Sequence, residues 1–161
     1  MRLWHKDLIP VLPREQLIST WRECSAIAGN IKTKGTPNHI LVNKIMDYSF
    51  DHFITYAAAV RAEMTKRGYR TMDSVWQKII SVADGEYKII PLEEVYLAWH
   101  NTRYLYQCYM NLAEKYDCGG IEEKDWGKIT NFFDKQAEQA WLNLMNQANI
   151  IKEKSNGVYS E

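Results

Sequence analysis

Apolar residues repeat every three or four positions along two long stretches of the chain, and this spacing constrains the fold more than any other feature. Such spacing marks one face of an α-helix, so it predicts two long amphipathic helices, over residues 92–116 and 126–151. The first stretch carries Leu92, Val95, Tyr96, Trp99, Thr102, Leu105, Tyr106, Tyr109, Leu112, Ala113 and Tyr116, and the second carries Trp126, Ile129, Phe133, Ala137, Ala140, Trp141, Leu144, Ala148 and Ile151. We expect both faces to lie in the core.

The N-terminal half predicts shorter helices. Pro13 suits the first turn of a helix whose apolar stripe is Leu17, Trp21, Cys24 and Ala28, and Gly29-Asn30 is a typical helix end. Further helices are predicted over residues 39–46, 50–64 and 73–82, the second of them closed by Lys66-Arg67-Gly68. No segment shows the alternation of a β-strand. The sequence therefore predicts an all-α protein, a single compact helical domain of about five to six helices.

Both ends of the chain are expected to lie outside this helical pattern. Pro10 and Pro13 indicate that residues 1–12 form an extended, irregular N-terminal arm. A chain of 161 residues suits one domain with its own core, which we predict to span residues 1–151. Residues 152–161 are polar, and we expect them to form a frayed tail.

Composition argues against several classes of protein. No run of about 18 apolar residues predicts a membrane-spanning helix, and the first residues lack the apolar segment of a secretory signal. The three scattered cysteines are typical of reduced thiols in a cytoplasmic protein rather than of disulfides or zinc ligands: Cys24, Cys108 and Cys118. We expect neither a metal nor an organic cofactor, because the histidines are equally scattered and no phosphate-binding glycine loop occurs: His5, His39, His52 and His100.

The charges are divided unevenly between the two halves of the chain, although the formal net charge is zero. Residues 1–80 hold 12 Lys/Arg against 7 Asp/Glu, whereas residues 81–161 hold 8 against 13. A basic half favours an anion-binding surface such as one for nucleic-acid phosphates. An accidental division of the charges is an equally good interpretation.

The predicted first helix carries a polar edge beside its apolar stripe. At about 100° per residue, Gln16, Ser19, Thr20 and Glu23 fall along one side of the helix, and Arg22 falls on another. A carboxylate among amide and hydroxyl groups could act as a general acid or base. Solvation of Glu23 at an ordinary helix surface is the alternative that the spacing leaves open.

Two motifs in this half resemble a known family. Residues 1–17 (Met-Arg-Leu-Trp-His-x-x-Leu-Ile-x-x-Leu-Pro-Arg-x-Gln-Leu) and the tetrad Trp21-Arg22-Glu23-Cys24 resemble the start of the phage-type pyrimidine-dimer DNA glycosylases and of related bacterial glycosylase-like proteins. A further similarity lies at Glu63-Met64-Thr65-Lys66-Arg67-Gly68-Tyr69. The resemblance covers roughly the first 70 residues, and the aromatic-rich C-terminal half carries no comparable motif.

The resemblance implies a DNA-repair enzyme that acts on double-stranded DNA carrying a lesion. In that family the N-terminal α-amine attacks C1′ of the damaged nucleotide and forms an imine, and strand cleavage by β-elimination can follow. An unperturbed α-amine has a pKa of about 8, so a useful fraction is nucleophilic at neutral pH. By this resemblance the amine belongs to Met1 and the acid/base is Glu23. The phosphate contacts are Arg2, Arg14 and Arg22, with solvation as the alternative for Arg2 and Arg14.

Three positions depart from the family pattern. Arg2 follows the initiator methionine where the phage enzymes have a small residue, and Gln16 and Ala26 replace a histidine and an arginine. Lys6 is an alternative imine-forming amine. The alternative function is a non-catalytic helical module that retains the scaffold and binds nucleic acid or protein. An enzyme requires the N-terminal amine close to Glu23, and a binding module does not.

Overall fold

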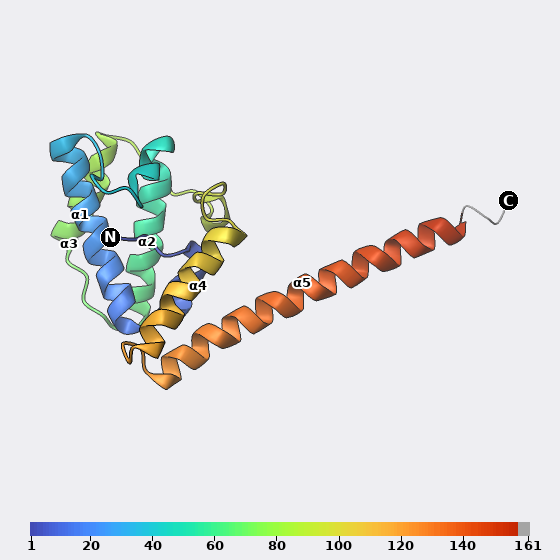
Figure 1. The fold of residues 1–161 in the computed structure, drawn as a ribbon. Helices are drawn as coiled ribbons and strands as arrows, with labels where there is room; N and C mark the ends of the chain where they lie inside the picture. Colours follow the sequence, from blue (N-terminus) through green and yellow to red (C-terminus); the bar gives the residue numbers. More distant parts are fainter. Residues whose placement is uncertain (158–161) are drawn as a thin grey trace.

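The computed structural model describes the backbone of residues 1–157 and the side chains of residues 1–147. All regular structure in this part of the chain is helical, which confirms the all-α prediction (Figure 1). The α-helices are α1 (Arg14–Lys34), α2 (Phe50–Lys66), α3 (Asp73–Ile80), α4 (Thr102–Asp117) and α5 (Glu123–Gly157), and the 3₁₀ helices are η1 (Lys6–Val11), η2 (Asn43–Asp47), η3 (Ser81–Ala83) and η4 (Leu92–Glu94).

The body of the molecule is built around α1 and α2, which lie side by side, with α3 packed mainly against α1 (Figure 1). Their facing sides supply fully buried apolar side chains: Leu17, Cys24, Ile27 and Ala28 from α1, and Phe53, Ile54, Tyr56, Ala57 and Val60 from α2. These positions follow the predicted helical spacing, because burial of one continuous stripe on each helix is what holds the two together. No helix in the described part is both long and apolar enough to cross a membrane.

The first helix is longer than the sequence predicted. The expected end at Gly29-Asn30 is wrong, because α1 continues for one more turn to Lys34. Ile31 is buried and holds this turn against the body, while Gly35, at φ 74°, adopts the left-handed conformation that closes a helix. Gly29 instead lies under the side chain of Lys78, whose Nζ is 2.9 Å from where a Cβ would stand.

Residues 92–101 are not part of a long helix, contrary to the expectation that one helix covers 92–116. They form η4 and a series of turns, and α4 begins only at Thr102. Tyr96 has a φ of 52°, which no helix accommodates. The Asn101 side chain accepts a hydrogen bond from the Tyr104 N–H and caps α4. The apolar spacing therefore continued across a helix boundary.

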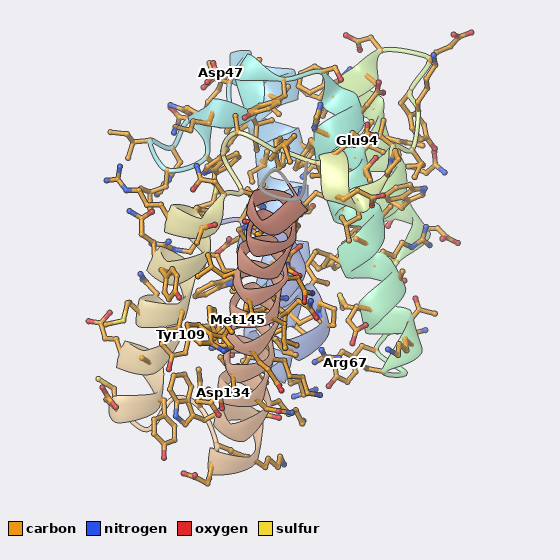
Figure 2. The ribbon with its side chains drawn as sticks, turned by 90° about the vertical axis from the view of Figure 1, so that its right-hand side faces the viewer. Asp47, Arg67, Glu94, Tyr109, Asp134 and Met145 are labelled. Atoms are coloured by element: carbon orange, nitrogen blue, oxygen red, sulfur yellow. The ribbon has the colours of Figure 1, made fainter. Side chains whose placement is uncertain are left out.

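Helix α5 extends away from the body (Figure 1), and in Figure 2, viewed from that side, it stands in front of the other helices. Among the side chains of α5 through residue 147, only those of the first turns are packed, with Ile129 fully buried. The predicted burial of six positions on α4 and α5 is wrong. Tyr106, Trp141 and Leu144 are 56%, 62% and 61% exposed, and Thr102, Ala137 and Ala140 are exposed as well. Periodicity identifies an apolar face, but it does not supply the partner that would cover it.

The predictions for the C-terminal end of the chain can be compared with the structure only in part. The side chains of Ala148 and Ile151 lie outside the described residues, as do residues 158–161 of the predicted tail. The backbone of α5 continues through Gly157 without interruption at residue 151. The assignment of residues 1–151 to one domain stays a prediction.

Candidate functional site

The first residues of the N-terminal arm are tied into the body by two tyrosines. The side chains of Leu3 and Trp4 are buried. The Tyr104 hydroxyl on α4 donates to the Leu3 carbonyl oxygen at 2.5 Å, and the Tyr56 hydroxyl on α2 donates to the Trp4 carbonyl oxygen at 2.8 Å. Residues 1–5 are irregular as predicted, whereas residues 6–11 form η1. Because its backbone is bonded on both sides, the arm holds its two terminal residues in one place.

A pair of buried histidines continues this attachment. His5 Nε2 donates to the His100 carbonyl oxygen at 2.7 Å, and the Lys6 backbone N–H donates to His100 Nδ1 at 3.0 Å. The two rings stack with their centroids 5.1 Å apart. These bonds require neutral imidazole at His100, since its Nδ1 accepts a hydrogen bond and therefore carries no proton. Burial, followed by the nearby charges of His5 and Lys6, lowers the pKa of His100 to about 2.

Lys6 is a structural anchor rather than a free amine. Its side chain is only 4% exposed. Its Nζ donates to the carbonyl oxygens of Glu93 and Val95, the latter at 2.8 Å. Burial lowers the pKa of Lys6, but both hydrogen bonds aim the nitrogen into the protein. The structure therefore argues against the alternative in which Lys6 forms the imine.

Arg67 of the second family-like motif, residues 63–69, holds the C-terminal end of the same arm. Arg67 donates to the carbonyl oxygens of Leu12 and Pro10 at 2.7 and 2.8 Å, and its Nε donates to Glu63 Oε1 at 2.7 Å. The guanidinium thus satisfies carbonyl groups at the end of η1 while a half-buried carboxylate balances its charge. This contact explains why two motifs so far apart in sequence occur together.

The arm brings the second residue of the chain directly to Glu23. The backbone N–H of Arg2 donates to Glu23 Oε2 at 2.7 Å. Glu23 is half-buried in the middle of α1, while the adjacent Arg22 is exposed. A carboxylate with one fixed donor retains free lone pairs on both oxygens. It is therefore held in place and still able to accept or return a proton.

A surface hollow opens beside this contact, and we call it the Glu23 hollow. Its lining comes from the arm, from the polar edge of α1, from the loop after α1 and from α4: Met1, Arg2, Trp4, Glu15, Gln16, Ser19, Arg22, Glu23, Leu41, Asn111 and Lys115. The Gln16 Oε1 atom is buried without a hydrogen-bond partner among the described residues. The hollow thus combines two carboxylates, Glu15 and Glu23, with three basic side chains and an unpaired amide oxygen.

Most of the predicted site residues meet in this hollow. Met1, Arg2, Arg22 and Glu23 all line it. Arg14 does not, because its guanidinium pairs with Glu15 at 3.0 Å and lies over the ring of Tyr69. Among the residues of the polar edge, Thr20 is fully buried and its hydroxyl donates to the Gln16 carbonyl oxygen of its own helix, so it does not reach the hollow.

Sequence reasoning missed the contribution of the C-terminal half. Asn111 and Lys115, one helical turn apart on α4, complete the wall of the hollow opposite α1. Nothing in the spacing of α4 distinguishes them from other polar helix positions. The aromatic residues of this half have a role that spacing also concealed, since Tyr104, Trp99 and His100 surround the arm with ring centroids 4.9–5.6 Å apart.

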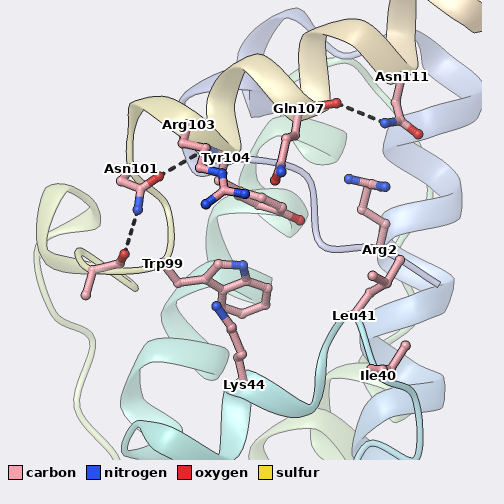
Figure 3. A pocket seen from close by; sticks show the side chains of 11 residues that line it. Arg2, Ile40, Leu41, Lys44, Trp99, Asn101, Arg103, Tyr104, Gln107 and Asn111 are labelled. Atoms are coloured by element: carbon pink, nitrogen blue, oxygen red, sulfur yellow. Dashed lines mark hydrogen bonds between the residues drawn. The ribbon is translucent and has the colours of Figure 1, made fainter.

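A second hollow adjoins the first, and we call it the Trp99 hollow (Figure 3). The two share Arg2, Leu41 and Asn111. Figure 3 shows Trp99 and Tyr104 at its base, with Arg2 and Leu41 facing them from the side of α1. Its cations are Arg2, Lys44 and Arg103, and no carboxylate lines it. The shared residues join the two hollows into one surface with a cationic border.

Comparison with known proteins agrees with the motifs. Residues 1–77 match the sequence model of a family described as pyrimidine dimer DNA glycosylase. This region contains the arm, α1, α2 and the loop between them, but neither α4 nor α5. No curated protein and no solved structure matches the chain. Over residues 1–77, slightly less than half of its length, the chain is similar to the pyrimidine dimer DNA glycosylase family.

Proposed function

We propose that this protein is a DNA-repair glycosylase and AP lyase that acts on double-stranded DNA carrying a damaged base such as a pyrimidine dimer. The catalytic pair is an α-amine at the N-terminus and the carboxylate of Glu23. One observation supports this proposal above the others: the hydrogen bond of 2.7 Å from the Arg2 backbone to Glu23. It brings the start of the chain to the single carboxylate of the family-like tetrad, as the mechanism requires.

The chemistry proceeds in two stages. The neutral amine attacks C1′ of the damaged nucleotide, and the bond from C1′ to the base breaks as the base takes the bonding electrons and a proton. The amine then passes a proton to the Glu23 carboxylate, the sugar ring opens, and Glu23 gives that proton to the ring oxygen as the imine forms. Loss of a proton from C2′ expels the 3′ phosphate and cleaves the strand.

Two nitrogens compete for the role of nucleophile. In the intact chain the free amine is that of Met1, which lines the Glu23 hollow. The nitrogen that touches Glu23 belongs to Arg2 and is an amide, which is not nucleophilic. The Met1 amine therefore attacks from one residue further along the arm, or Arg2 supplies the amine once Met1 is removed.

The cations of the two hollows provide contacts for the phosphate backbone. Arg2 and Arg22 lie beside Glu23 and can hold phosphates on either side of the lesion. Lys115 of α4 extends this set. Arg14 has the weakest claim, since it does not line the hollow and its guanidinium pairs with Glu15. With few such contacts, DNA affinity should be moderate and should fall as salt rises.

Borohydride trapping tests the proposal. The protein is incubated with a duplex containing one thymine dimer, and borohydride reduces any imine to a covalent adduct. We expect an adduct from the intact chain or from a chain that begins at Arg2, but none after N-terminal acetylation and none with undamaged DNA. Peptide mapping of the adduct identifies the nucleophile. Absence of an adduct from both chains at low salt would exclude this mechanism.

A non-catalytic binding module is the second candidate function, and one observation favours it. Helix α5 exposes Trp141, Leu142 and Leu144, each at least 48% exposed. Large exposed apolar side chains on one element commonly mark a protein-binding surface. If trapping fails while damaged DNA still binds, this second function becomes the better interpretation.

A further inference from the structure

The loop between α1 and η2 carries two large apolar side chains at its tip. Ile40 is 85% exposed, the highest value among the large apolar side chains described, and Leu41 is 49% exposed. Both line the Trp99 hollow, and Leu41 also lines the Glu23 hollow (Figure 3). Exposure of such side chains beside a polar site is costly in water, so it calls for a ligand that covers them.

The tip is held in position by the loop beneath it. The His39 carbonyl oxygen accepts from the N–H groups of Val42 and Asn43, both at 3.0 Å, and the Asn43 side chain accepts from the His39 N–H at 3.0 Å. The Asn30 side chain on α1 donates to the Pro37 carbonyl oxygen at 2.9 Å. Val42 is fully buried. Ile40 and Leu41 therefore project from a braced turn.

The groups around the tip suit nucleic acid better than a second protein. Arg2, Lys44 and Arg103 line the same hollow as the tip, which contains no carboxylate. Phosphates can occupy such cations on both sides while an apolar tip enters the base stack between them. A partner that met only the apolar tip would leave these cations without counter-charges.

We propose that Ile40 and Leu41 form a wedge that inserts into the base stack of the bound duplex and opens it at the lesion. The inference rests on the proposed function, because it assigns the tip a task in the same reaction. Insertion replaces the lost stacking of the bases with apolar contacts, and it moves the damaged nucleotide away from its neighbours. Since Leu41 lines both hollows, the opened step lies next to Glu23.

The double variant I40A/L41A tests the wedge with two duplexes. One contains a thymine dimer in intact duplex, and in the other the strand opposite the dimer is interrupted by a short gap that already unstacks the site. We expect kcat/KM on the intact duplex to fall about 10- to 100-fold, and on the gapped duplex by less than about threefold. Equal losses on both duplexes, or no loss on the intact one, would overturn the proposal.

Matched controls separate opening from general damage to the protein. Met46 is 42% exposed in η2 and lines neither hollow, so Met46→Ala should behave as the unmodified protein on both duplexes. A double change of Ile40 and Leu41 to methionine keeps apolar bulk at the tip and should restore most of the rate on the intact duplex. Circular dichroism checks that each variant is folded.

A fluorescence measurement keeps the wedge testable even if the proposed function fails. The adenine analogue 2-aminopurine, placed beside the dimer, brightens when it unstacks. Binding of the Glu23→Gln variant should raise this fluorescence, and adding I40A/L41A should abolish the rise at saturating protein. A rise without any trapped adduct from the unmodified protein would refute catalysis and retain the wedge. No rise would refute the wedge whatever the adduct shows.

Discussion

The N-terminal arm and the outer part of α5 differ in opposite ways in their regular structure and in their contacts with the body of the molecule. The arm contains only the short 3₁₀ helix η1, yet its backbone is bonded to α2, to α4 and to the turns around His100. The outer part of α5, from Ala137 onward, is perfectly regular, yet its large apolar side chains within the described residues are exposed: Trp141, Leu142, Leu144 and Met145. Regularity and integration into the fold are thus separate properties. The arm belongs to the region that matches a family, and α5 does not.

The largest expected effect is on catalysis at the end of the arm. Glu23→Gln removes the charge and keeps the shape, and we expect kcat/KM on dimer-containing duplex to fall by about 100-fold or more, since a positioned acid/base contributes at least that much. Glu15→Gln is the control, because Glu15 lines the same hollow but is 70% exposed. An equal loss of kcat/KM in both variants would contradict the role of Glu23 as the acid/base, because any carboxylate of the hollow would then matter as much.

Two leucines compare the body with the outer part of α5. Leu112 on α4 is fully buried and Leu144 on α5 is 61% exposed. We expect Leu112→Ala to lower the free energy of unfolding by about 2–5 kcal/mol, and Leu144→Ala to change it by less than about 0.5 kcal/mol. Denaturant unfolding measures both. A large loss at Leu144 would break the comparison, because it would mean that a partner covers α5 in solution.

The attachment of the arm should depend on pH. The pKa of His100 is about 2 in the folded protein and about 6.5 in an unfolded chain. Below pH 6.5 the unfolded chain binds a proton that the folded protein excludes. The free energy of unfolding should therefore fall with decreasing pH, by up to about 1.4 kcal/mol per pH unit for this group. Burial also lowers the pKa of His5, in the same direction.

His100→Asn tests the source of this dependence. An asparagine side chain can still accept from the Lys6 N–H, but it does not titrate. The stability of this variant should decline less steeply between pH 6.5 and 5 than that of the unmodified protein. An unchanged slope would assign the pH dependence to other groups and would weaken the view that buried histidines hold the arm.

The smallest effect concerns salt dependence within the family-like region. Arg22 lines the Glu23 hollow and Arg14 does not. Arg22→Ala should lower the slope of log affinity against log salt by about 1, whereas Arg14→Ala should leave it nearly unchanged. Titrations of labelled duplex at several salt concentrations measure the slope. A larger change for Arg14 would reverse the assignment of phosphate contacts.

Local patterns predicted the parts of the fold that depend on local physics. The apolar stripe of α1 and the basic-then-glycine end of α2 are visible in the sequence because each is formed within a few residues. Glu23 was identifiable because its polar edge and its family-like tetrad are both local. The extra turn of α1 was not, since it depends on Ile31 finding a place in the core.

Contacts between distant segments could not be predicted in this way. Tyr104 is 101 residues from the Leu3 carbonyl that it binds, and His100 is 94 residues from Lys6. Lys115 joins the Glu23 hollow only because α4 packs near α1. The burial of the long apolar faces of α4 and α5 could not be predicted for the same reason, since it depends on which other segments pack against each face.

The hydrogen bond from Arg2 to Glu23 has a practical consequence for anyone who prepares this protein. Apart from this bond, the anchors of the arm lie at Leu3 or beyond it. Additional residues in front of Met1, such as a purification tag, would therefore leave folding and stability unchanged while removing the amine from the hollow. Cleavage after Met1 would have the opposite effect and turn the amide beside Glu23 into a primary amine. Under the proposed mechanism, this single peptide bond decides which nitrogen can react, and a stability assay would not detect the difference.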